Sequence, residues 1–119
     1  MRKVLLVITV VAVLAGLVAT AAAVTSAGTN AVSVADNQYT PHKFSIHKGT
    51  TVKWTWASDN ANEHTVNQAD KHYDPKDGGF ASKEQVTGKA FTHKFKKKGT
   101  FYIVCLVHPT DMRMKIVVK

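Results

Sequence analysis

The chain has 119 residues, of which 16 are Lys or Arg and 8 are Asp or Glu, so its formal net charge is +8. This length fits a single domain and leaves no room for a multidomain enzyme. The single cysteine excludes an internal disulfide, and it also excludes a structural zinc site built from several cysteines. With 45% hydrophobic and 20% charged residues, the composition is that of a globular protein rather than a disordered one.

Residues 1–27 have the features of an export signal. Arg2 and Lys3 precede residues 4–24, which contain no charged side chain. The Ala-rich end of this segment offers small-residue cleavage sites, for example after Ala21, Ala23 or Ala27, which predicts a signal peptide. An uncleaved membrane anchor is the alternative, because 21 uncharged residues approach the length that spans a bilayer. In both cases we expect residues 28–119 to be exported, to the periplasm or the outer surface of the cell.

The remaining charge is moderately positive. Without Arg2 and Lys3, the chain keeps 14 basic and 8 acidic residues. Part of the excess is local, in Lys94, Lys96, Lys97 and Lys98, and solvated strand ends explain such a cluster better than a nucleic-acid site does. We therefore expect no nucleic acid partner.

From Ala31 onward the apolar residues recur with a period of two and are separated by Gly, Pro, Asn and Asp, which predicts short strands. Strands are expected near 32–34, 44–46, 52–56, 91–95, 101–105 and 114–118, with residues 67–79 as a loop. Within 52–56, Val52, Trp54 and Trp56 share one face, which predicts a half-buried strand. About eight short strands at this spacing predict an all-β sandwich.

Three sulfur- or imidazole-bearing residues lie close together near the end of the chain. Cys105, His108 and Met112 belong to the segment CLVHPTDM, and His64 lies 41 residues before the cysteine. A thiolate, two imidazoles and a weak thioether are the donors of a trigonal blue-copper site, and they suit both Cu(I) and Cu(II). Three ligands on one short loop and a fourth on a neighbouring segment would keep one geometry in both oxidation states.

Each of these residues taken alone has a simpler explanation. A single cysteine at a strand end is usually a small buried hydrophobe, and a single methionine usually fills a core. The conjunction of all four is much rarer than any one of them. Four other histidines lack such neighbours and are expected to be structural or solvent-exposed: His42, His47, His72 and His93. A thiol hydrolase is disfavoured because no glycine turn or orienting asparagine flanks the cysteine.

The sequence resembles the cupredoxins, the small blue copper proteins that include plastocyanin, pseudoazurin, amicyanin and halocyanin. Matching segments are YTPHKFSIHKGTTVKW (39–54), EHTV (63–66), FASKEQVTGKAFTHKF (80–95) and KGTFYIVCLVHPTDMRMKIVV (98–118). The resemblance implies a Greek-key β-sandwich over residues 28–119. It also implies one type 1 copper ion held by His64, Cys105, His108 and Met112, and a role as a monomeric one-electron carrier rather than an enzyme.

Three positions depart from the usual pattern of that family. Met114 competes with Met112 for the axial position, and the motif favours Met112. Val107 replaces the proline of many members and so restores a backbone N–H, which we expect to donate a hydrogen bond to the thiolate. Thr65 stands where several relatives have asparagine; its hydroxyl either joins the two ligand loops or belongs to a plain strand residue.

The same resemblance implies that electrons pass through His108, whose ring edge reaches the surface in an apolar patch to which Leu106, Val107 and Pro109 contribute. Small interfaces of this kind suit transient redox partners. The positive net charge favours a partner that is acidic at its docking surface. An exported copper carrier or storage protein could use the same ligands and is the alternative function.

Overall fold

A computed structural model describes residues 28–119, and the expected signal peptide or anchor at 1–27 lies outside the described residues. The described chain forms eight strands. Their bounds are β1 (Thr29–Ala35), β2 (Gln38–Thr40), β3 (Lys43–Ile46), β4 (Thr51–Trp56), β5 (Asn67–Ala69), β6 (Phe91–Lys94), β7 (Gly99–Val104) and β8 (Arg113–Val118). Within residues 28–119, no helix is long and apolar enough to cross a membrane.

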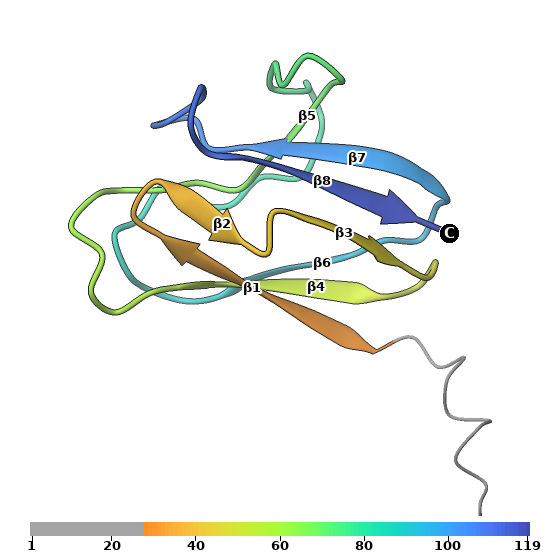
Figure 1. Cartoon of the computed structure of the whole chain (residues 1–119), viewed down its shortest axis with the longest axis horizontal. Coiled ribbons are helices and arrows are strands. Elements are labelled where there is room, and N and C mark those ends of the chain that lie inside the picture. Colours follow the sequence, from red (N-terminus) through yellow and green to blue (C-terminus); the bar gives the residue numbers. More distant parts are fainter. Residues whose placement is uncertain (1–27) are drawn as a thin grey trace, which may run out of the picture.

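The strands form two four-stranded sheets, with the orders β2-β1-β4-β6 and β3-β8-β7-β5. The two sheets face each other, and the chain passes repeatedly from one to the other (Figure 1). β1 pairs with β4, and β3 pairs with β8, in parallel; the other pairings are antiparallel. The predicted all-β Greek-key sandwich of about eight strands is therefore confirmed.

The core follows from the period-two pattern of β4. Val52, Trp54 and Trp56 are buried while Lys53 and Thr55 are exposed, as the alternation predicts. Trp54 is fully buried and packs on Phe80, Phe91 and Phe95, with ring centroids 5.7–6.4 Å apart. These aromatic side chains fill the space between the two sheets beside β6.

Two of the eight strands were not predicted. β2 has three residues, of which only Tyr39 is buried, so it offers no alternation to detect. Residues 67–79 were expected to be a loop, but Asn67–Ala69 form β5, which pairs with β7 at the edge of its sheet. The polar side chains of Asn67 and Gln68 are tolerated because the strand is short and lies at an edge.

The sandwich has two ends with different contents. One end, called the cysteine end, contains the connections 36–37, 57–66 and 105–112. The opposite end, called the terminal end, contains the connections 47–50 and 95–98 together with Gly28 and Lys119. Figure 1 shows the C-terminus at the same end as the first residues of β1. The two ends are separated by the length of β4 and β7, six residues each.

Candidate metal centre

The cysteine end brings together three of the four predicted ligands. The donor atoms of His64, Cys105 and His108 all lie within 4.8 Å of one another. Metal bonds to nitrogen and sulfur are about 2.0–2.3 Å long, so donors that share one ion lie less than about 5 Å apart. The cluster therefore has the size of a single-metal site, although its residues come from connections 41 residues apart in the chain.

His64 is held by its backbone and by one nitrogen of its ring. Its N–H donates to the Gln85 carbonyl at 3.0 Å, and its own carbonyl accepts from Gln85 N–H and from the indole N–H of Trp56. Its ring is fully buried, and ring Nε2 lies 2.9 Å from Asp36 Oδ1. These contacts leave the ring little freedom to turn.

Asp36 selects the tautomer of this ring. A carboxylate only accepts hydrogen bonds, so the proton lies on Nε2 of His64 and the lone pair lies on Nδ1. The Asp36 carboxylate also accepts from the backbone N–H groups of Ala61 and Asn62. Hydrogen bonds from Ala61, then from the His64 ring, hold the pKa of Asp36 below its usual range. Asp36 is thus an ionised partner of the histidine.

The Nδ1 atom of His64 is buried and has no hydrogen-bond partner in the described structure. Buried polar atoms are nearly always paired, so an unpaired lone pair beside a thiol and a second imidazole is evidence for a missing electron-pair acceptor. The Cys105 sulfur lies 3.8 Å from Nδ1 of His108. A soft thiolate with two imidazoles fits copper, which accepts both donor types in both oxidation states.

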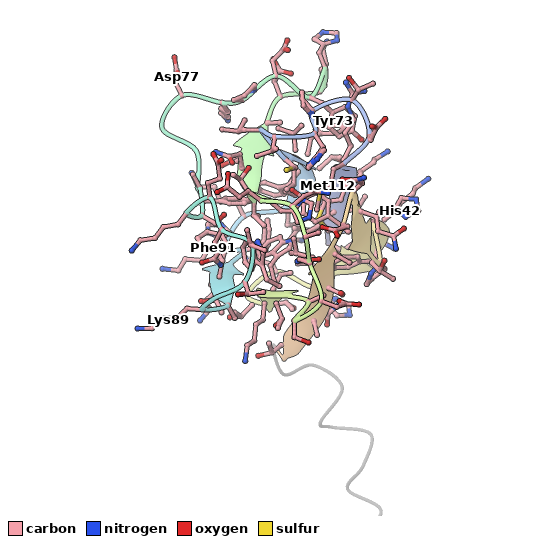
Figure 2. The ribbon with its side chains drawn as sticks, turned by 90° about the vertical axis from the view of Figure 1, so that its left-hand side faces the viewer. His42, Tyr73, Asp77, Lys89, Phe91 and Met112 are labelled. Carbon is pink, nitrogen blue, oxygen red and sulfur yellow. The ribbon has the colours of Figure 1, made fainter. Side chains whose placement is uncertain are left out.

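Met112 is fully buried in the core beside these residues. Its carbonyl accepts from Cys105 N–H at 3.0 Å, and its N–H donates to the His108 carbonyl at 2.9 Å. These two bonds close the 105–112 connection into a compact loop. Figure 2 shows Met112 in the interior, whereas Asp77 and Lys89 project from the surface. The Met112 sulfur is therefore available only to groups inside the sandwich.

Thr65 joins the two ligand-bearing connections. Its backbone N–H donates to the Cys105 sulfur at 3.4 Å, and its hydroxyl accepts from Leu106 N–H at 2.9 Å. Of the two alternatives for Thr65, the structure supports the one in which its hydroxyl joins the loops. Among residues 28–119, the backbone hydrogen bond to the cysteine sulfur comes from Thr65 and not from Val107, so the expectation for Val107 was wrong.

Tyr39 holds the backbone of Thr65 through a hydrogen bond. Its hydroxyl donates to the Thr65 carbonyl. Burial, and secondarily the nearby Cys105, raises the pKa of Tyr39, so the hydroxyl stays protonated and remains a donor. Sequence reasoning missed both Tyr39 and Asp36, because neither lies near His64 or Thr65 in the chain. Asp36 is 28 residues from His64 and has the local signature of a simple turn.

The remaining predicted features lie as follows. His42, His47 and His72 are exposed, and His93 is half-buried, so among the described histidines only His64 and His108 reach the cysteine. His108 is half-buried, and its neighbours Leu106 and Val107 are the exposed large hydrophobic residues of the described chain, at 45% and 39% exposure. Exposed apolar side chains therefore precede the half-buried His108 in the same loop.

Comparisons with known proteins agree with this arrangement. Residues 6–118 match the family model of the Cupredoxin-like domain. A purple cupredoxin from Nitrosopumilus maritimus has 24% identity and a TM-score of 0.67, over 76% of this chain and 99% of that one. A reduced Cu(I) form of an amicyanin variant has 26% identity and a TM-score of 0.62, over 82% of this chain and 89% of that one.

An enzyme also contains this fold. A copper-containing nitrite reductase from Thermus scotoductus SA-01 has 23% identity and a TM-score of 0.62, over 76% of this chain but only 22% of the enzyme. The similarity to the enzyme is thus confined to a domain-sized part of it. No curated protein sequence matches the chain significantly.

Proposed function

Since this chain belongs to the cupredoxin-like family, we propose that it is a blue copper protein that shuttles single electrons between redox partners outside the cytoplasmic membrane. The observation that carries the proposal is the buried, unpaired Nδ1 of His64 beside the sulfur of Cys105 and the ring of His108. In this proposal His64, Cys105 and His108 would hold one type 1 copper ion, and Met112 would be its fourth, weak ligand. The protein is a carrier and not an enzyme.

A bound copper ion would supply one-electron chemistry by alternating between Cu(II) and Cu(I). The residues of the chain keep the geometry constant during that change. Asp36 holds the His64 ring, and Thr65 holds both the Cys105 sulfur and the Leu106 backbone. A site that does not rearrange exchanges electrons with a low barrier. Burial of His64, Cys105 and Met112 excludes water from all sides except that of His108.

His108 is the proposed route for electrons. Its half-exposed ring lies in the patch formed by Leu106, Val107 and Pro109, the last of which is also exposed. An apolar patch of a few side chains gives a small interface, which forms and dissociates quickly. The transient partner therefore contacts this patch.

The acidic character of that partner stays a prediction based on net charge. The three connections of the cysteine end carry four carboxylates, from Asp36, Asp59, Glu63 and Asp111, and no Lys or Arg. Electron-transfer rates with an acidic partner that fall as salt is added would support the prediction. A faster electron-transfer rate with a basic partner at low salt would contradict the prediction. It would show that these carboxylates attract the partner.

The proposal is tested by adding Cu(II) to the purified metal-free protein and recording its visible spectrum. An intense thiolate-to-copper band is expected, and Cys105→Ser should abolish it because the thiolate is lost. His72→Gln, which removes an exposed histidine that is not part of the cluster, is the matched control and should keep the band. Absence of the band in the wild-type protein would refute the copper site.

An exported copper carrier or storage protein remains the alternative function. The two are separated by a reversible redox couple and by the rate at which a chelator removes copper. A closed site with buried donors is expected to release copper slowly and to cycle reversibly. Rapid release together with an irreversible couple would favour the carrier.

A further inference from the structure

The terminal end carries a concentrated positive charge that the proposed electron transfer does not use. Its lysines are all exposed, and the connections 47–50 and 95–98 contain no Asp or Glu. We call these lysines the basic patch; its members are Lys48, Lys94, Lys96, Lys97 and Lys98. The cysteine end is less positive, because its three connections contain four carboxylates and no Lys or Arg. Basic groups do reach this end: Arg113 donates to the Pro109 carbonyl, and Gln85, which pairs with His64, lies between Lys83 and Lys89. The positive charge is therefore concentrated at the terminal end.

Backbone hydrogen bonds hold the basic patch together. Gly49 N–H donates to the Phe95 carbonyl at 2.6 Å, which joins the connection containing Lys48 to the one containing Lys96. Gly49 has a φ of 94°, a conformation that glycine adopts without strain, so the turn brings Lys48 beside the other connection. The backbone positions that carry the patch lysines are thus fixed relative to one another.

The chain also joins the domain at this end. Thr51 N–H donates to the Gly28 carbonyl at 3.1 Å, so Gly28 lies beside the start of β4 and next to the turn at Gly49. Only residues 25–27 separate Gly28 from the uncharged segment 4–24. An extended chain spans at most about 3.6 Å per residue, so this spacer reaches little more than about 10 Å. If segment 4–24 lies in a bilayer, the basic patch lies at the headgroups.

We propose that the basic patch at the terminal end docks on anionic lipid headgroups of a membrane surface and holds the cysteine end facing away from it. Lysines near an anionic leaflet are attracted by its negative surface potential. Three of them, Lys94, Lys96 and Lys97, also line a recess of about 560 Å³ together with Lys76. Phe95 and Phe101 contribute apolar surface to the same recess.

The acidic cysteine end does not oppose this docking. Six-residue strands at about 3.3 Å per residue place the two ends roughly 20 Å apart, which is twice the Debye length at moderate salt. The carboxylates of the cysteine end are therefore screened from the lipid. An anionic membrane would repel these carboxylates if the cysteine end came close to it. The repulsion favours the orientation in which His108 faces away from the membrane. The docking does not depend on copper, so it can be tested independently of the proposed electron transfer.

The test uses the full chain in vesicles of phosphatidylcholine, with and without the anionic lipid phosphatidylglycerol. Acylation of each lysine by a water-soluble reagent is followed by mass spectrometry. Slower acylation of the patch lysines is expected only on anionic vesicles, and high salt should remove the protection. Three of the four lysines of the connection 70–90 should react equally on both kinds of vesicle; these are Lys71, Lys83 and Lys89. The fourth, Lys76, lines the same recess as the patch lysines and does not serve as a control.

Matched charge variants sharpen the test. Each lysine near an anionic surface contributes about fivefold to docking, so the triple change Lys96→Gln, Lys97→Gln and Lys98→Gln should lower it about a hundredfold. Lys48 and Lys94, which remain, then lose their protection. The control triple Lys71→Gln, Lys83→Gln and Lys89→Gln removes the same charge and should leave Lys48 and Lys94 protected.

Three results would overturn the proposal. Patch lysines that react equally on both kinds of vesicle would show that anionic lipid does not bind them. Equal loss of protection in both triple variants would show that binding depends on the net charge of the protein and not on the basic patch. Protection by polyglutamate but not by anionic vesicles would assign the patch to an acidic protein instead.

Discussion

The indole Nε1–H of Trp54 donates a hydrogen bond to the sulfur of Met114, and the two atoms are 3.2 Å apart. Both side chains are fully buried, and Met114 faces the core from β8 opposite Ile103. The sulfur of Met114 therefore already serves as the acceptor for a buried donor. Met112 and Met114 are the two candidates for the weak thioether ligand. Met114 is engaged by Trp54, whereas the backbone of Met112 bonds to Cys105 and His108, so Met112 is the better candidate.

Replacing Met114 with leucine should affect stability and leave the metal site intact. The change nearly preserves volume but leaves the Trp54 N–H without its acceptor, so the free energy of unfolding should fall by about 1–2 kcal/mol. The measurement is urea unfolding of the metal-free protein, combined with the visible spectrum of the copper-loaded protein. An altered spectrum in Met114→Leu would contradict the assignment of Met112.

The matched change Met112→Leu should have the converse effect. Loss of a weak axial thioether favours Cu(I) over Cu(II), so the reduction potential should rise. The metal-free protein should lose less than about 1.5 kcal/mol, because leucine fills a similar volume. Voltammetry of both variants separates the roles. An unchanged potential in Met112→Leu would show that this sulfur is not a ligand.

Thr65→Val tests the junction between the two ligand-bearing connections. Valine keeps the shape and the backbone N–H that reaches the Cys105 sulfur, but it removes the hydroxyl that accepts from Leu106 N–H. We expect a loss of about 1–2 kcal/mol in the free energy of unfolding of the metal-free protein. Thr65→Ser retains the acceptor and should be closer to wild type. Equal losses in both variants would mean that packing of the Thr65 methyl group, not its hydroxyl, is what matters.

Asp36→Asn tests the carboxylate that orients His64. The amide oxygen can still accept the hydrogen bond from the ring. It lacks the negative charge that makes the imidazole a stronger electron-pair donor to a metal. Copper affinity should fall by about tenfold or more, and the reduction potential should rise because Cu(II) loses more than Cu(I). Competition with a chelator measures the affinity. Asp59→Asn removes a charge from the same end and is the control, which should show neither change.

His93 gives a pH dependence that does not involve the metal. Its ring stacks on Phe80 with centroids 4.1 Å apart and meets Phe95 edge-on at 4.7 Å. Burial, and then repulsion from Lys96, lowers the pKa of His93. The unfolded chain therefore binds the proton more readily than the folded one. The stabilisation is complete above the ordinary histidine pKa of about 6.5 and is lost as the pH falls through the lowered value.

The comparison of wild type with His93→Gln isolates this effect in the metal-free protein. The two proteins differ only at residue 93, so contributions from the rest of the chain cancel in the difference. The stability advantage of wild type over His93→Gln should shrink as the pH is lowered from about 7.5 to about 5. Urea unfolding at each pH provides the measurement. A difference that does not change with pH would show that the ring titrates normally.

Much of the fold could be predicted because its signals are local. The alternation of Val52, Trp54 and Trp56 fixes the buried face of β4 from adjacent residues alone. β2 and β5 could not be predicted, since three residues carry too little periodicity and their pairing energy comes from β1 and β7. For these short edge strands, tertiary pairing decides the conformation.

The same division holds for the candidate site. Cys105, His108 and Met112 were predictable because their spacing within one loop is itself the signal. The sequence by itself determined the sandwich and the net positive charge, and it predicted the donor set. Only the tertiary structure decided that Asp36 holds His64, that the Met114 sulfur accepts from Trp54, and that Lys48 lies beside the connection of Lys96, Lys97 and Lys98. The physical reason is that hydrogen bonds and charge distributions depend on distances in space, which strand pairing creates between residues far apart in the chain.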